Sequence, residues 1–109
     1  MKKLILFISI FLCAFILQAQ QYTLTDDDVV VTDGVIMSCS YDFTLTDIII
    51  PETLDGQTVT EIWGDPGISG SAFVEKGITS IVFPETLLKI GRYTFYKNEL
   101  STVIIPNSV

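Results

Sequence analysis

The side chains that most often carry out catalysis or bind metal ions are scarce in this sequence of 109 residues. It contains no histidine, which excludes Ser-His-Asp and Cys-His catalytic groups and histidine-based metal sites. Gly64, Gly67 and Gly70 are spaced by three, but they do not lie between a strand and a helix as the glycines of a phosphate-binding loop do. The sequence therefore predicts no cofactor and no nucleotide site.

Carboxylates are the only metal-binding group that is clustered. Asp26, Asp27 and Asp28 are consecutive, and Asp33 and Asp42 follow nearby. Ca²⁺ takes several carboxylate and carbonyl oxygens, so a calcium site is one interpretation. The spacing matches no calcium-binding loop, and we favour a solvated acidic turn.

A second pair of carboxylates, Glu52 and Glu85, follows two similar segments and could face each other across neighbouring strands. Glycosidases use such a pair, but their chemistry needs a cleft, and a flat sheet offers none. We therefore expect the chain not to be an enzyme.

The first 19 residues have the order of a secretory signal peptide. A basic start at Lys2 and Lys3 precedes an apolar run of about 14 residues, and a small residue, Ala19, follows. At about 1.5 Å per residue the run reaches about 21 Å, which is short of a hydrocarbon core of about 30 Å. We expect cleavage after Ala19, although the bulky Leu17 leaves the bond uncertain, and a secreted or cell-surface location without membrane insertion.

Cleavage makes an acidic chain more acidic. The formal net charge is −7, and it becomes −9 when Lys2 and Lys3 are lost. Such a surface repels phosphate backbones and anionic lipid, which argues against nucleic-acid binding. Cys39 is then the only cysteine, so no intrachain disulfide is possible. We expect Cys39 to be a small buried hydrophobe, with an intermolecular bond as the alternative.

One phrase occurs three times and predicts the architecture. "DIIIPETL" at 47–54 returns as "SIVFPETL" at 80–87 and as "TVIIPNSV" at 102–109. The second and third copies are 22 residues apart, and the first precedes the second by 33. The extra residues fall in two turn-rich insertions, at 55–59 and 63–69, which suits surface loops. Between these insertions Thr60-Glu61-Ile62 matches Leu88-Lys89-Ile90.

A fixed short period predicts a repeat solenoid whose units bury their apolar faces against one another. We expect adjacent parallel strands at 47–50, 80–83 and 102–105, each ended by the proline that follows, because proline has no N–H for the ladder. Alternation along a strand predicts two inward columns. They are Ile48, Ile81 and Val103 in one, and Ile50, Phe83 and Ile105 in the other.

Residues 78–100, "ITSIVFPETLLKIGRYTFYKNEL", resemble the leucine-rich repeat of the BspA type. Thr94 departs from the usual alanine of that pattern, whereas Ala72 in the preceding copy conforms. The resemblance extends over roughly 45–109. It implies a secreted or surface protein of host-associated bacteria that acts in adhesion, with an irregular or short-helical side opposite the strands. It implies no catalytic residues.

The predicted organisation is a signal peptide at 1–19, an N-terminal β cap at 20–44 and about three leucine-rich repeats at 45–109, the last one incomplete. The cap should contain a hairpin of 29–31 and 35–37, because Asp33-Gly34 between them is a strong turn signal. A cap is expected because the first repeat of a solenoid has one face without a neighbour.

The outward positions of the strands are the predicted binding residues. One column is Asp47, Ser80 and Thr102, and the other is the apolar set Ile49, Val82 and Ile104. A continuous exposed apolar strip suits a partner, but β-propensity alone would also place such residues there, and a neighbouring segment of the same protein could cover them. Trp63, in an insertion, either anchors a partner or packs over the side of the repeats.

These features favour a non-catalytic module that binds a protein or glycan partner at the cell exterior. The alternative is a structural spacer in a larger surface protein whose active domain lies beyond residue 109.

Overall fold

The computed structural model describes residues 20–65, 67 and 70–109 of the chain. The predicted signal peptide at 1–19 lies outside the described residues and stays a prediction. Within the described part, no helix is long and apolar enough to cross a membrane.

The described chain consists mainly of short strands joined by turns, with one single-turn 3₁₀ helix, η1 (Asp26–Asp28). The strands are β1 (Gln21–Thr23), β2 (Val29–Thr32), β3 (Val35–Cys39), β4 (Asp47–Ile49), β5 (Thr53–Leu54), β6 (Gln57–Thr58), β7 (Glu61–Ile62), β8 (Ser80–Val82) and β9 (Lys89–Ile90).

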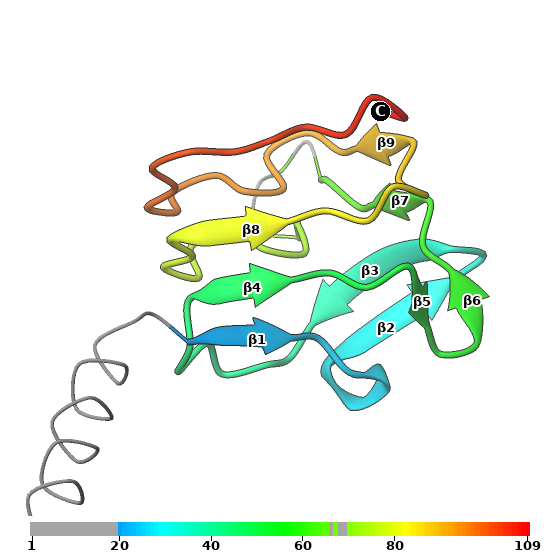
Figure 1. Ribbon diagram of the computed structural model, residues 1–109, viewed down its shortest axis with the longest axis horizontal. Helices are drawn as coiled ribbons and strands as arrows, with labels where there is room; N and C mark the ends of the chain where they lie inside the picture. Colours follow the sequence, from blue (N-terminus) through cyan, green and yellow to red (C-terminus); the bar gives the residue numbers. More distant parts are fainter. Residues whose placement is uncertain (1–19, 66, 68–69) are drawn as a thin grey trace, which may run out of the picture.

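The first sheet is a parallel ladder in the order β1-β4-β8 (Figure 1). Tyr22 lies opposite Ile48, and Ile48 lies opposite Ile81. The second pairing joins residues 33 apart, as the repeated phrase predicted. The prediction that 47–50 and 80–83 form adjacent parallel strands is confirmed, and both strands end before their prolines.

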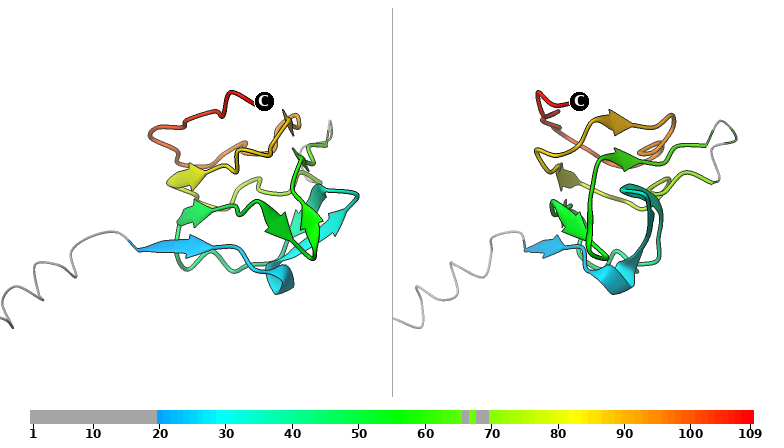
Figure 2. Two further views of the ribbon diagram at one scale, coloured as in Figure 1. Left: turned by 45° about the vertical axis from the view of Figure 1, so that its right-hand side comes forward. Right: turned by 90° about the vertical axis from the view of Figure 1, so that its right-hand side faces the viewer.

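The second sheet has the order β2-β3-β7-β9. Strands β2 and β3 form the predicted antiparallel hairpin around Asp33-Gly34, where both residues have positive φ. β3, β7 and β9 then run parallel, and Ile62 pairs with Ile90 as the sequence match indicated. The chain passes alternately from one sheet to the other (Figure 2).

The insertion at 55–59 provides the turn and the second strand of a small antiparallel hairpin of β5 and β6, since β5 directly precedes it. Its turn, Asp55-Gly56, is exposed and has positive φ at both residues. The expectation of a surface turn is confirmed for this insertion.

The core lies between the two sheets and consists of inward residues from both. Ile48, Ile50, Ile81 and Phe83 are all buried, so the two inward columns are confirmed for the first two copies of the phrase. Val82, between Ile81 and Phe83, is 45% exposed, as strand alternation requires.

Aromatic rings connect successive repeats inside this core. Phe73 and Phe95, which are 22 residues apart, stack with ring centroids 5.3 Å apart. Beside the core, the half-buried Tyr22 stacks on Tyr41 with ring centroids 3.9 Å apart. Cys39 is a buried free thiol, as expected, and burial raises its pKa.

Asn98 fastens one repeat to the preceding one through backbone hydrogen bonds. Its Oδ1 accepts from the amides of Lys76 and Ile78, each at 3.0 Å, and its Nδ2 donates to the carbonyl of Phe73 at 2.7 Å. A single polar side chain thus satisfies three backbone groups of the 73–78 turn.

The third copy of the phrase departs from the prediction. Residues 102–105 are not a strand, and Val103 and Ile105, expected to point inward, are 40% and 51% exposed. No hydrogen bond within the described chain joins them to β8. No described strand lies on the far side of residues 102–105, so nothing on that side supplies hydrogen bonds to them. A composition rich in β-branched residues does not by itself create a ladder. Only the proline of this copy, Pro106, is buried.

The first parallel ladder begins within the segment that the sequence assigned to the cap. Strand β1 lies before residue 45 and pairs with β4 in the same way as β4 pairs with β8. The hairpin of β2 and β3 likewise continues into the second sheet through β7.

Candidate functional site

A groove of about 300 Å³ opens between β8 and the C-terminal segment 102–106. In Figure 1 this segment runs above β8. The groove is lined by Ser80, Ile81, Val82, Phe83, Glu85, Thr102, Ile104 and Pro106. Its volume lies at the small end of the range for ligand-binding sites.

The groove lies where the parallel ladder stops. Leu24 donates its amide hydrogen to the carbonyl of Ile49 at 3.0 Å, and Ile50 donates to Val82 at 2.9 Å. The next bond of this series would join Phe83 to Ile104, and it is not among the hydrogen bonds of the described residues. The outer edge of β8 is therefore an open strand edge, which is a template for another strand.

Apolar side chains project beside this edge. Val82 is 45% exposed on β8, and Ile104 is 85% exposed on the opposite wall. Ser80 is held in place because its hydroxyl donates to Oδ1 of Asp47 at 2.6 Å. Glu85 is exposed and is the only charged residue in the groove lining of the described chain.

The structure brings together most of the residues that the sequence singled out. Ser80, Val82, Thr102 and Ile104 all line the groove. Asp47 and Ile49 lie on the neighbouring strand, β4, in register with Ser80 and Val82, and both are half-buried. Together these six residues occupy adjoining parts of one face.

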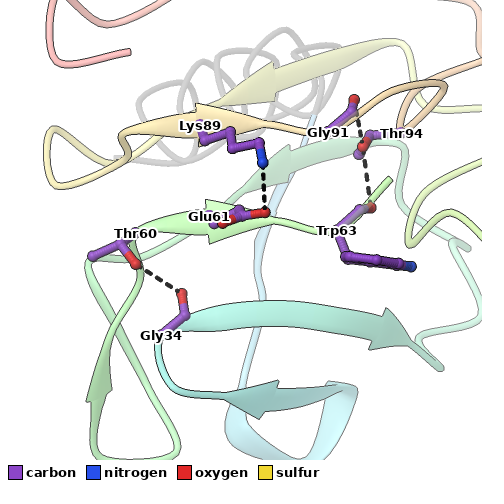
Figure 3. A network of polar contacts seen from close by, with 7 residues as sticks. All are labelled: Gly34, Thr60, Glu61, Trp63, Lys89, Gly91 and Thr94. Carbon is purple, nitrogen blue, oxygen red and sulfur yellow. Dashed lines mark hydrogen bonds and ion pairs between the residues drawn. The ribbon is translucent and has the colours of Figure 1, made fainter. Parts of the chain in front are cut away.

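Trp63 lies elsewhere, directly after β7 in the second sheet. Its backbone is fixed, because its amide donates to Ile36 at 2.9 Å and its carbonyl accepts from Thr94 Oγ1 at 3.1 Å. The residue is 37% exposed, and its side chain points away from the ion pair of Glu61 and Lys89 (Figure 3). Trp63 is therefore not part of the groove.

Sequence reasoning missed four groove residues: Ile81, Phe83, Glu85 and Pro106. Phe83 was expected to be a core residue, and its side chain is indeed buried, but its backbone forms part of the open edge. The first two copies of the phrase place a glutamate directly after the proline, and this was the available signal for Glu85.

The acidic run has a structural role at η1. The carboxylate of Asp28 accepts hydrogen bonds from the Thr25 amide at 2.8 Å, the Thr25 hydroxyl at 3.0 Å and the Tyr22 hydroxyl at 2.7 Å. Partial burial acts to raise the pKa of Asp28, but these hydrogen bonds outweigh it and lower the pKa. The hydrogen bond to Asp28 raises the pKa of Tyr22. Across the described residues, no group of three or more His, Cys, Asp or Glu side chains is arranged to hold a metal ion.

Among protein-family models, "BspA type Leucine rich repeat region (6 copies)" matches residues 66–109. Residues 66–109 carry BspA-type leucine-rich repeats. Every residue that lines the groove belongs to this BspA-type segment. Leucine-rich repeats generally serve as non-enzymatic modules that bind proteins. Neither the comparison with curated proteins nor that with solved structures finds a match.

Proposed function

We propose that this chain is a secreted or cell-surface repeat module that attaches to a partner protein at the cell exterior and catalyses no reaction. The BspA-type segment and the basic-then-apolar leader at 1–19 support this proposal. A protein is favoured over a glycan because leucine-rich repeats generally bind proteins.

The proposed architecture is a solenoid. Its support is the alternation of the chain between two parallel ladders, β1-β4-β8 and β3-β7-β9, with a core between them. In this proposal 45–109 holds about three repeats, and 20–44 covers the N-terminal end while contributing β1 to the first ladder.

The observation that carries the proposed function is the exposure of Val82 and Ile104 on the two sides of one groove, at 45% and 85%. An apolar side chain exposed to this extent gains little for the fold. Two of them across an open strand edge form a surface that a partner can bury.

The test is a selection for protein ligands that uses the full chain as bait. A phage library of random linear and disulfide-looped peptides is selected on the purified protein, and binders are retested on Val82→Thr with Ile104→Thr. This double variant keeps β-propensity while removing apolar surface. Val30→Thr is the matched control, since Val30 is 57% exposed on β2 outside the groove.

We expect enriched binders whose affinity is at least tenfold lower for the double variant. Their affinity for the Val30→Thr control should be unchanged. Absence of enrichment over an unrelated acidic protein would contradict the binding function. Binders that are indifferent to the double variant would move the site to Trp63 and the insertions.

A further inference from the structure

We propose that the groove binds an extended segment of the partner as an added parallel strand on β8, with its inward side chains apolar and a cationic side chain beside Glu85. This inference rests on the proposed function and adds the mode of binding and the chemistry of the ligand.

The first step concerns the direction of the backbone groups on β8. The carbonyls of Ile49 and Val82, whose side chains point outward, accept from the neighbouring segment, from Leu24 and Ile50 respectively. Backbone groups of successive residues in a strand point to opposite edges. The polar backbone groups of Ile81 and Phe83 therefore point to the other edge of β8, into the groove.

The second step concerns orientation. All pairs in this sheet are parallel, and the pairing of β4 with β8 brings Ile48 opposite Ile81. A strand that continues the same pattern is parallel to β8. Its inward side chains then extend the column of Ile48 and Ile81, which are 0% and 6% exposed.

Parallel geometry also decides which residues of the ligand bond to β8. On β8 itself, Val82 is the residue whose carbonyl accepts a hydrogen bond from the preceding segment, at Ile50. Its side chain points outward. In a parallel ligand strand, the residues that bond to β8 are likewise those with outward side chains. In an antiparallel strand they would be those with inward side chains, because directly opposed residues share one face of the sheet.

The third step concerns charge. Glu85 is the only charged side chain among the described groove residues, and Asp47 is bonded to the lining residue Ser80. None of the described residues that line the groove is a lysine or arginine. With a chain charge of −7, the groove favours a ligand that carries lysine or arginine.

The probe is a capped heptapeptide in which three threonines alternate with two valines between terminal lysines. Its affinity for the full chain is measured by calorimetry. Two matched peptides carry two N-methyl groups each, either on two threonines or on the two valines. A methylated amide cannot donate, and valine enters the inward column while threonine points outward.

We expect the parent peptide to bind, threonine methylation to weaken it by about tenfold and valine methylation to change it by less than about threefold. Glu85→Gln should weaken the parent peptide by about two- to fivefold and reduce the salt dependence of binding. The amide of Phe83 should exchange with solvent quickly in the free protein and slowly in the complex.

Several outcomes would overturn the inference. If only valine methylation lowers the affinity, the peptide binds as an antiparallel strand. If all three peptides bind with equal affinity, the peptide binds without pairing to the strand edge. A Phe83 amide already protected in the free protein means that residues 102–105 close the edge themselves. If phage-selected binders depend on Val82 and Ile104 while the heptapeptide does not bind, the function stands and the strand-addition mode is wrong.

Discussion

The amide of Ile50 donates a hydrogen bond to the carbonyl oxygen of Val82 over 2.9 Å, beyond the last residue of β4. The backbone of Val82 therefore belongs to the ladder, while the residue is 45% exposed. Because the ladder uses only the backbone of Val82, we expect that its side chain can be replaced, to test binding, without loss of the ladder. The neighbouring residue Ile81 has the opposite environment, since it is 6% exposed.

The first prediction compares these neighbours. Val82→Thr should change the free energy of unfolding by less than about 1 kcal/mol, because an exposed strand position keeps its β-propensity. Ile81→Ala should cost about 2–4 kcal/mol, because it leaves a cavity in the inward column. Urea denaturation followed by circular dichroism measures both. Equal costs for the two changes would contradict the assignment of inward and outward faces.

The second prediction concerns a close approach between two repeats. A Cβ at Gly91 would collide with the backbone of Gly64 and lie 2.9 Å from the carbonyl of Ile62. Gly91→Ala should therefore lower stability by about 2 kcal/mol or more, since a backbone neighbour cannot move aside cheaply. Gly67→Ala is the control, because among the described residues the nearest atoms to its Cβ belong to the side chain of Asp65, at 3.3 Å and beyond. Thermal unfolding of both variants is the measurement, and a shift no greater for Gly91 than for Gly67 would rule out this contact.

The third prediction concerns Asn98. Asn98→Ala removes hydrogen bonds to two amides and one carbonyl of the 73–78 turn and should cost about 2–4 kcal/mol. Asn107→Ala, at an exposed turn, should have little effect. Hydrogen exchange at the amides of Lys76 and Ile78 should accelerate only in the first variant. Unchanged protection of these amides in Asn98→Ala would show that the side chain is not their acceptor.

The fourth prediction concerns acid. The folded pKa of Asp28 is lowered from its usual value of 3.8, so the folded state binds this proton less readily than the unfolded state does. The stabilisation by Asp28 is therefore complete above pH 3.8 and is lost as the pH falls through the folded pKa. The unfolding midpoint of the original protein should fall below about pH 4. This fall should be much smaller in Asp28→Asn and somewhat smaller in Tyr22→Phe, which removes one of the hydrogen bonds to Asp28. A profile that is the same in all three proteins would contradict this linkage.

The sequence by itself determined the period, the alternation and the strand stops of the repeats. Ile48 pairs with Ile81 and Ile62 with Ile90, as the matched phrases indicated. These features are local or repetitive, because side-chain alternation and proline act within a few residues and identical units stack in identical register. The hairpin at Asp33-Gly34 belongs to the same class, since a turn signal acts locally.

The tertiary structure decided which copies of the phrase become strands. Residues 102–105 are as rich in strand-forming residues as 80–83, yet they are exposed and pair with no described strand. In contrast, β1 joins the ladder without a recognisable copy of the phrase. Strand formation depends on a neighbour that supplies hydrogen bonds and buries side chains, and a single strand's composition does not contain that neighbour. The groove beside β8 has the same origin. Ser80, Val82, Thr102 and Ile104 were visible in the sequence as outward positions. The space between them exists because no hydrogen bond of the described residues joins Phe83 to Ile104.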